Sequence, residues 1–399
     1  MTVHFELALF VIMLCVFAYA LFSNAITKTI LTLPIIFMGV GYFASHAVEG
    51  VASPETLDYG RRLLAEVTLV LVLFSDASHV RFKRLRESFQ YPLRMLIVGL
   101  PLTLALGTAV AYFLSPESGL AMALLTAAVL TPTDAALGQT VVTSPDVPPR
   151  LSQTINVESG LNDGLVLPFV LLGAILASTG VGHTTEGLAV NAVLQIVLGP
   201  IAGIVIGWGI AKLMGMAQDH DIMAEASGGV AFLMIAFAAF VGAEIIGGNG
   251  FIAAFVGGMV FGNSYKHEIH FISEFMEGFG QLLTMAAFFV FGALLLPDGL
   301  AHMTWTAVIL AILFLTVVRI LPIWLSLAGT GLDLREKLFL GWFGPRGIAS
   351  ILFTLIMIDE FDFPGEEELL ACVSMTVFLS IILHGVTAAP LSRWIGRKT

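Results

Sequence analysis

The sequence predicts an all-α, polytopic membrane protein, and its composition and the length of its apolar runs support that prediction. The 399 residues are 57% hydrophobic and 12% charged, with a mean hydropathy of +0.94, whereas a soluble domain carries about 25% charged residues. A helix that crosses the hydrocarbon layer of roughly 30 Å needs about 20 apolar residues. Thirteen runs approach that length. Runs this long exclude a membrane barrel, because only helices and closed barrels satisfy backbone groups in lipid.

The expected spans follow one another along the whole chain with short connections. The first is read as a span and not as a cleaved signal, because the apolar run from Phe5 to Phe22 lacks a basic leader. The eighth and ninth spans are divided at Gly247-Gly248, and no soluble domain is expected after Pro390. The expected ranges are 4–22, 29–48, 62–80, 91–114, 118–142, 152–178, 187–214, 223–242, 245–262, 275–297, 304–328, 336–358 and 367–389.

The distribution of Lys and Arg predicts the orientation of the spans. The loop after the third span carries the basic cluster "RFKRLRE", and an odd number of spans places most other basic residues on the same side. Only Arg61 and Arg62 fall on the opposite side. Because basic loops stay in the cytoplasm, we expect the N-terminus outside and the C-terminus inside. The outer loops are acidic, as in "DEFDFPGEEE", and an acidic rim concentrates cations, although ordinary solvated loops have the same composition.

Five charged side chains fall inside predicted spans, namely Asp134, Glu158, Asp163, Arg319 and Arg346. Asp163 lies roughly ten residues into the sixth span, or about 15 Å at 1.5 Å per residue, which is close to mid-bilayer. Each such group costs about 2.5–3.5 kcal/mol at a helix centre, so intramembrane charges either pair with one another or mark an ion pathway. A purely structural pair is an equally reasonable interpretation for Glu158 with either arginine.

Three acids face two arginines, so one carboxylate is left over. Arginine keeps its proton and serves as a fixed counter-charge. Glu158 and Asn162 are four residues apart and share a helix face, whereas Asp163 is turned by about 100°. We expect Asp163 to be the unpaired acid, and burial disfavours its bare anion. It would hold a proton or a cation but not both, and such competition is sufficient for antiport.

Two spans carry helix breakers near their centres. Pro132 in "VLTPTDAALG" and Pro345 in "WFGPRGIAS" each remove a backbone donor and clash with the preceding turn. If spans 1–6 and spans 8–13 are the two halves of the chain, each proline lies in the fifth helix of its half. Matched interruptions of this kind indicate an inverted-repeat transporter with a midplane site. We therefore expect two inverted six-helix repeats, roughly 1–178 and 223–389, linked by the span 187–214 in a single membrane domain.

The broken helices also offer groups that bind ions. Unwound carbonyls, such as that of Thr133, can coordinate a cation. Asp134 lies at the start of a half-helix, where a carboxylate is favoured by the partial positive charge. A lone proline often produces only a kink, but paired breaks beside buried charges favour a site.

The motifs "TPTDA", then "ESGLNDG", then "GPRG" far downstream resemble those of the monovalent cation:proton antiporters of the NhaP and sodium/proton exchanger type. The resemblance covers nearly the whole chain, and the "ESGLND" segment is its most specific part. It implies a thirteen-helix fold with two broken, crossing helices, in which a core domain moves against a dimerisation domain like an elevator. It also implies a homodimer.

The same resemblance assigns roles to individual residues. Asp163 would bind the cation or the proton, Ser159 and the backbone of Thr133 would complete the ion shell, and Asp134 would lie close by. Asn162 is the position that marks electroneutral exchange in the family.

For the partner of Glu158 and for the acid of the third span, the sequence leaves more than one candidate. Glu158 would form a structural ion pair with Arg319, Arg346 or both. The acid expected from the third span is Asp76 or Glu66, and we favour Asp76. The chain departs from the family where Ala135 follows the span-five Asp134 in place of the Pro that the family often has there.

The remaining features do not indicate an enzyme or a cofactor. We find no catalytic triad, zinc spacing or nucleotide signature, and Cys15 and Cys372 lie in apolar segments. The glycine-rich "IIGGNGFIAAFVGGMVFG" favours tight helix packing over a phosphate loop. Five histidines are expected near membrane edges, where interfacial packing is favoured over pH sensing; they are His46, His79, His267, His270 and His384.

We therefore expect a secondary antiporter. Its expected partners are a monovalent cation, a proton, membrane lipid and a second copy of the chain, without nucleic acid. Na⁺ is the first expectation, with K⁺ and Li⁺ as alternatives. An organic cation on the same fold is the other transport hypothesis, and a cation channel or a non-transporting sensor is the alternative from a different class. A bacterial plasma membrane is the expected location.

Overall fold

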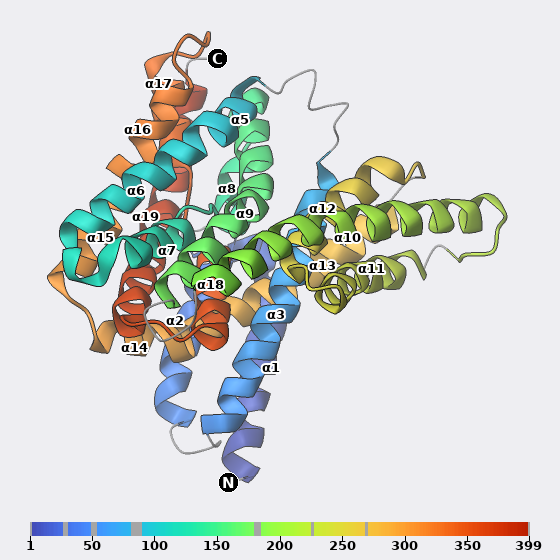
Figure 1. Ribbon diagram of the computed structural model, residues 1–399, viewed down its shortest axis with the longest axis horizontal. Helices are drawn as coiled ribbons and strands as arrows, with labels where there is room; N and C mark the ends of the chain where they lie inside the picture. Colours follow the sequence, from blue (N-terminus) through green and yellow to red (C-terminus); the bar gives the residue numbers. More distant parts are fainter. Residues whose placement is uncertain are drawn as a thin grey trace.

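The computed structural model describes residues 2–26, 31–48, 54–80, 90–178, 185–224, 227–267 and 270–397, and the regular elements in them are helices (Figure 1). The first half contains α1 Thr2–Ile26, α2 Leu33–Val48, α3 Pro54–His79, α5 Gln90–Arg94, η1 Met95–Gly99, α6 Leu100–Leu114, η2 Pro116–Ser118, α7 Gly119–Leu130, α8 Ala135–Val142 and α9 Pro149–Ser178. The second half contains α10 Thr185–Asp219, α11 Ser227–Ile245, α12 Gly250–Ser264, α13 His270–Val290, η4 Phe291–Leu295, α14 Leu296–Ala301, α15 Trp305–Leu315, α16 Val317–Ser326, α17 Leu334–Trp342, α18 Ile348–Glu360 and α19 Glu366–Gly396.

The helices are those of a multi-pass membrane protein. Among the described residues, seven helical stretches are long and apolar enough to cross a membrane; they are 90–114, 149–178, 193–219, 227–245, 278–301, 305–326 and 366–396. Large apolar side chains such as Phe17, Trp208 and Ile245 are more than half exposed, as expected of a surface that faces lipid. A helix lies over each of the thirteen expected ranges, while thirteen crossings remain a prediction.

Several boundaries differ from the predicted ones. The helix expected at 187–214 extends to Asp219, and the last one continues to Gly396. The predicted division at Gly247-Gly248 is a turn in which Gly247 has a φ of 78°, and Asn249 caps α12 by accepting from the backbone N–H of Ile252 at 3.0 Å. The span expected at 304–328 is interrupted at Thr316, a break that no proline announces.

Both predicted helix interruptions are present. The chain leaves helical geometry between α7 and α8 around Pro132, and between α17 and α18 around Pro345. Proline removes a backbone donor at each point. The two short irregular segments lie side by side in the middle of the molecule, because the backbone N–H of Asp134 donates to the carbonyl of Pro345 at 2.8 Å.

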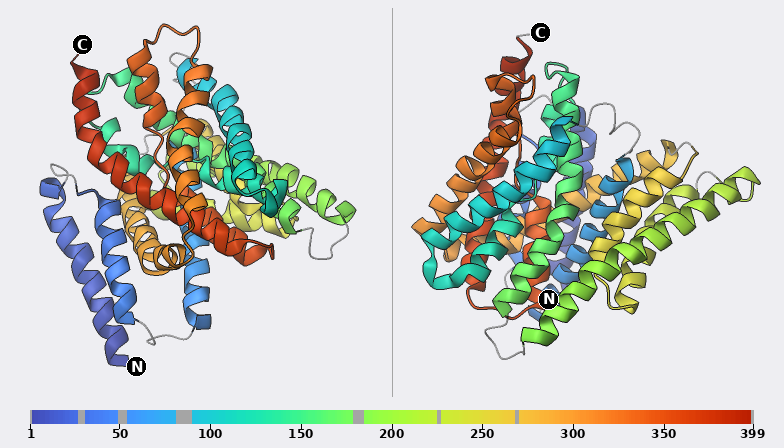
Figure 2. Two further views of the ribbon diagram at one scale, coloured as in Figure 1. Left: turned by 90° about the vertical axis from the view of Figure 1, so that its left-hand side faces the viewer. Right: turned by 45° about the horizontal axis from the view of Figure 1, so that its top comes forward.

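One group of helices is joined by unusually close backbone contacts. α12 packs between α10 and α3 (Figure 2), and glycines line both seams. A Cβ on Gly203 or Gly207 of α10 would lie 2.5 or 2.4 Å from a carbonyl oxygen of α12. On the other side, a Cβ on Gly258 would lie 2.2 Å from the carbonyl of Phe74 in α3. Only glycine permits such approach, so α3, α10 and α12 form one tightly packed unit.

A second group contains α6 to α9 and α15 to α19, which pack mainly on one another. α3, α12 and α13 contact α9 and α18 of this group, so the interrupted helices lie beside the junction between the two groups. The start of α1 and the end of α19 lie at opposite ends of the molecule in Figures 1 and 2.

Candidate functional site

The candidate site is built where the two interrupted spans meet beside α9. Besides the backbone bond from Asp134 to Pro345, the hydroxyl of Ser350 in α18 donates to the carbonyl of Val129 in α7 at 2.7 Å. Ser350 has no measurable exposure. Each interrupted span therefore forms hydrogen bonds with backbone groups that the other interruption leaves free. Irregular backbone inside a membrane protein requires such partners.

Asp134 caps two half-helices at once. Its Oδ1 accepts from the backbone N–H of Leu137 in α8 at 3.1 Å, and its Oδ2 accepts from that of Ile348 in α18 at 2.7 Å. Helix N-termini carry unsatisfied N–H groups and partial positive charge, so one carboxylate neutralises both. The position of Asp134 at the start of a half-helix is as predicted, but its bond to α18 was not foreseen. Gly347 makes this approach possible, since its Cβ would lie 1.9 Å from Oδ2.

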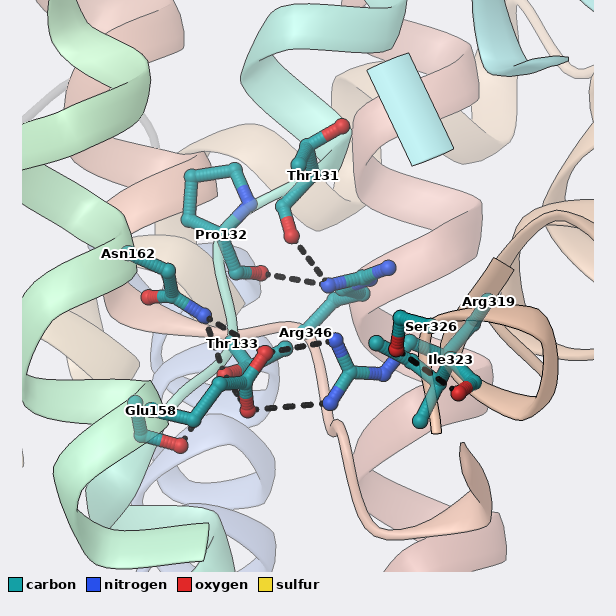
Figure 3. Close-up of polar contacts among 10 residues, drawn as sticks. Thr131, Pro132, Thr133, Glu158, Asn162, Arg319, Ile323, Ser326 and Arg346 are labelled. Carbon is teal, nitrogen blue, oxygen red and sulfur yellow. Dashed lines mark hydrogen bonds and ion pairs between the residues drawn. The ribbon is translucent and has the colours of Figure 1, made fainter. Parts of the chain in front are cut away.

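Glu158 on α9 forms a two-pronged ion pair with Arg319 on α16, shown in Figure 3. The Arg319 NH1 lies 2.6 Å from Oε1 and NH2 lies 2.9 Å from Oε2. Both side chains are buried. Of the two arginines left open by the sequence, the structure thus places Arg319 against Glu158. Gly344 lies over the guanidinium, where a Cβ would come within 2.2 Å of Nε.

Arg346 binds backbone instead. Its NH1 donates to the carbonyl oxygens of Thr131 and, at 2.9 Å, of Pro132 (Figure 3). These are the carbonyls that the break after α7 releases, so a fixed positive charge from one interrupted span holds the unwound backbone of the other. Arg346 is fully buried, and its Nε and NH2 have no hydrogen-bond acceptor among the described residues.

Thr133 connects the unwound segment to α9. Its hydroxyl lies 2.9 Å from the hydroxyl of Ser159 and 3.3 Å from Oε2 of Glu158. The amide nitrogen of Asn162 donates to the Thr133 hydroxyl at 2.5 Å and to Oε1 of Glu158 at 3.4 Å. Glu158 and Asn162 therefore share a helix face, as their spacing predicts. The structure brings Thr133, Ser159 and Asn162 together through their side chains.

Asp163 occupies the next position on α9 and has a different environment. It is 7% exposed, and its buried Oδ1 has no hydrogen-bond donor in the described part of the chain. No basic side chain within the described ranges forms an ion pair with it. Asp76, Asp134 and Glu158 are close enough to act on its charge, and Arg346 opposes them. The carboxylate is thus buried and lacks a basic partner within the described ranges.

α3 carries both candidates for the accessory acid expected from the third span, Asp76 and Glu66. Asp76 faces α9, because a Cβ on Gly160 would contact the Asp76 Cβ at 3.8 Å. Glu66 lies nearer the other end of α3 and bonds to Arg62 at 2.8 Å. The structure therefore brings Asp76, and not Glu66, beside the candidate site.

Two residues of α19 belong to the same cluster and were not recognised as such. The hydroxyl of Ser380 accepts from the backbone N–H of Arg346 at 2.7 Å. His384, which the sequence placed near a membrane edge, is 2% exposed and lies 2.9 Å from the carbonyl of Trp342. The interfacial prediction for His384 is wrong, because α19 continues to Gly396 and carries His384 further from its end than expected. The side chains of His46 and His270 lie outside the described residues.

The arrangement provides oxygen ligands suited to a hard cation and a carboxylate that a proton can neutralise. Buried oxygens of Asn162 and Asp163 lack donors within the described residues, which leaves them available as ligands. Within the described residues, no three His, Cys, Asp or Glu side chains cluster in the way that holds a resident metal.

Fold and site together define a multi-pass helical membrane protein with two discontinuous spans that meet over buried acids. The chain matches the family described as "Sodium/hydrogen exchanger, transmembrane" over residues 8–394. It therefore belongs to the transmembrane sodium/hydrogen exchanger family, as the motifs of α7, α9 and the α17–α18 break predicted.

Similar proteins agree with this membership. The K(+)/H(+) antiporter NhaP2 of Shewanella oneidensis is 25% identical over 362 residues, which cover 90% of this chain and 62% of NhaP2. The chain thus spans less than two thirds of that relative's length. The Na(+)/H(+) antiporter NhaH of Halobacillus dabanensis is 28% identical over 308 residues, covering 74% of this chain and 73% of NhaH.

A solved structure has the same fold. The sodium proton antiporter MjNhaP1 of Methanocaldococcus jannaschii at pH 8 superposes with a TM-score of 0.75 and covers 99% of both chains at 16% identity. At that identity the likeness concerns the arrangement of the helices.

Proposed function

We propose that this chain is a secondary-active antiporter, and not an enzyme, that exchanges a monovalent cation for a proton, with both ions competing for Asp163. The observation that carries the proposal is the state of this carboxylate. It is buried, has an oxygen without a donor in the described part of the chain, and forms no ion pair there. A bare anion in such surroundings is unstable, so either a proton or a cation must neutralise it.

The ion shell follows from the neighbours of Asp163. Ser159 and the backbone of Thr133 supply further oxygens, and Asp134, Asn162 and Asp76 lie close by. The Glu158–Arg319 pair and Arg346 serve as fixed structural charges. Asn162 supports electroneutral exchange, since its amide contributes no second exchangeable charge. Na⁺ is the first candidate substrate, and K⁺ or Li⁺ are alternatives, because similar proteins are named as Na⁺/H⁺ and K⁺/H⁺ antiporters.

The transport cycle would alternate access by an elevator-like movement of the α6–α9 and α15–α19 group against the group that contains α3, α10 and α12. Residues 1–178 and 223–389 would form two inverted repeats linked by the span 187–214, and the protein would work as a homodimer in a bacterial plasma membrane. The opposite positions of the start of α1 and the end of α19 support an odd number of crossings, with the N-terminus outside and the C-terminus in the cytoplasm.

Proton flux in inverted vesicles tests the proposal. We expect addition of Na⁺, K⁺ or Li⁺ to raise the pH inside acid-loaded vesicles, and Asp163→Asn to abolish that response. Glu117→Gln is the matched control, because Glu117 is an exposed acid outside the site. Ion current without proton movement would identify a channel. A vesicle pH that does not respond to added cation, in wild type as in the variants, would contradict antiport.

Competition for one carboxylate also sets the pH dependence. Where Asp163 is mostly protonated in the absence of cation, each unit of falling pH should raise the apparent KM for the cation about tenfold, because proton release is linked to cation binding. The maximal rate at saturating cation should change less. The measurement is the flux titrated with cation between pH 6 and 9, and an apparent KM independent of pH throughout would rule out competition. A potential-sensitive dye should report no net charge movement.

A further inference from the structure

Two side chains of α19 bridge the break between α17 and α18. Ser380 Oγ binds the backbone N–H of Arg346 at 2.7 Å, after the break. His384 Nε2 lies 2.9 Å from the carbonyl of Trp342, the last residue of α17 before the break. Because Ser380 and His384 are four residues apart on one helix, they lie on the same face. One face of α19 therefore fixes both sides of the interruption.

Both ring nitrogens of His384 have partners. Nδ1 lies 2.9 Å from the backbone carbonyl of Ser380 and 3.2 Å from the Ser380 hydroxyl, and Nε2 lies 2.9 Å from the Trp342 carbonyl. A carbonyl oxygen only accepts, and a neutral imidazole donates from one nitrogen, so these contacts do not select one tautomer. In every protonation state the ring joins Ser380 to the end of α17.

The chain of contacts continues into the candidate ion site. Arg346 is held by its backbone at Ser380, and its guanidinium holds the carbonyls of Thr131 and Pro132. The next residue is Thr133, whose hydroxyl contacts Ser159 and Asn162. Displacement of the Arg346 backbone would therefore move the unwound segment that carries Thr133.

We propose that Ser380 and His384 are positioning residues for the ion site. Ser380 holds the backbone of Arg346, and His384 joins Ser380 to the end of α17, so that Arg346 stays against the unwound carbonyls. This inference rests on the proposed antiport function, since its readout is cation transport. Neither residue touches the ion. The role concerns the affinity for the cation and not the titration of the site.

The experiment compares four variants with wild type in the vesicle flux assay, measuring apparent cation KM, maximal rate and pH profile. Ser380→Ala removes the acceptor, and we expect the apparent KM to rise about fivefold to tenfold, the effect of one net hydrogen bond. Ser380→Thr keeps a hydroxyl and should restore the wild-type KM. His384→Leu should resemble Ser380→Ala, whereas His384→Gln retains an N–H donor for the Trp342 carbonyl and should keep an apparent KM near that of wild type.

Thr387→Val is the matched control on the same helix. Thr387 Oγ1 accepts from the indole N–H of Trp342 at 3.0 Å, so this variant weakens the contact between α17 and α19 without touching Arg346. We expect its apparent KM to equal that of wild type. If Ser380→Ala does not accumulate as folded protein, Ser380→Cys provides a weaker acceptor of similar size and should also raise KM.

The outcomes separate this inference from the antiport proposal. Wild type without cation-dependent proton flux would contradict antiport itself. With wild type active and Asp163→Asn inactive, an unchanged KM in Ser380→Ala would overturn the positioning role. A wild-type KM in His384→Leu would overturn the role assigned to His384, because that variant removes both ring nitrogens.

Discussion

The buried acids of this protein differ in role because their neighbours differ. Glu158 is matched by the guanidinium of Arg319, and Asp134 by the N–H groups at two half-helix ends. Asp163 has neither kind of partner among the described residues. Two of these carboxylates are thus held by defined partners and the third is not, and the difference comes from the groups that surround each.

Removal of Glu158 should act on folding before it acts on transport. Glu158→Ala leaves Arg319 charged and buried without its partner, which costs about 3–5 kcal/mol. We expect a strongly reduced yield of monodisperse protein in size-exclusion chromatography, with Glu117→Gln near the wild-type yield. A normal yield combined with abolished flux would instead assign Glu158 to ion binding.

At the scale of elements, the two interruptions form one structure. Asp134 joins the first residues of α8 and α18, Ser350 joins α18 to the end of α7, and Arg346 joins the α17–α18 break to the carbonyls after α7. Each broken span completes the hydrogen bonding of the other. The pair should therefore form and be lost together on folding and unfolding.

The small residue at position 347 is essential to this structure. In Gly347→Ala, the added methyl would lie 1.9 Å from Oδ2 of Asp134 and should displace the carboxylate from both helix ends. Loss of a cap costs about 0.5–2 kcal/mol, so we expect a lower Tm and reduced flux. The control is Gly209→Ala on α10, where a Cβ would meet nothing within 4 Å. Equal melting temperatures for the two variants would show that Asp134 adapts without loss.

The sequence predicted what depends on local chemistry. Proline and buried charge are visible in "TPTDA" and "GPRG", so both breaks, the family and the cluster around Asp163 could be expected. The break at Thr316 could not, because no local signal accompanies it. The choice of Arg319 for Glu158, the contact of Asp134 with α18, and the burial of His384 depend on how distant helices meet. Their sequence separations give no information on that geometry.

At the scale of the whole molecule, the junction between the two helix groups is the surface at which movement would occur. On the side of the junction that carries Glu66, Arg62 of α3 bonds to Asp359 of α18 at 2.5 Å and to Glu66 on its own helix at 2.8 Å. Arg62 is half-exposed, and exposed pairs contribute only about 0–1 kcal/mol. Such a contact can open and close in each cycle.

A covalent link across this junction should stop transport. In a protein whose native Cys15 and Cys372 are replaced by serine, Arg62→Cys with Asp359→Cys can be joined by a short bifunctional thiol reagent. We expect the flux to fall on linking and to recover after reductive cleavage of the reagent. Arg62→Cys with Glu66→Cys lies within α3 alone and should remain active when linked. Full activity of the linked 62–359 protein would show that α3 and α18 do not separate.

The glycine-lined seams of α12 determine which positions tolerate change. Wherever main chains touch directly, even one extra methyl group has no room, so Gly203, Gly207 and Gly258 should accept no other residue although they bind nothing. Variation among natural versions of this chain should consequently be low along two stripes of α12 and its neighbours. A substitution at these glycines should reduce the amount of folded protein and so lower the transport of every cation equally. A substitution in the ion site should instead change which cation is preferred.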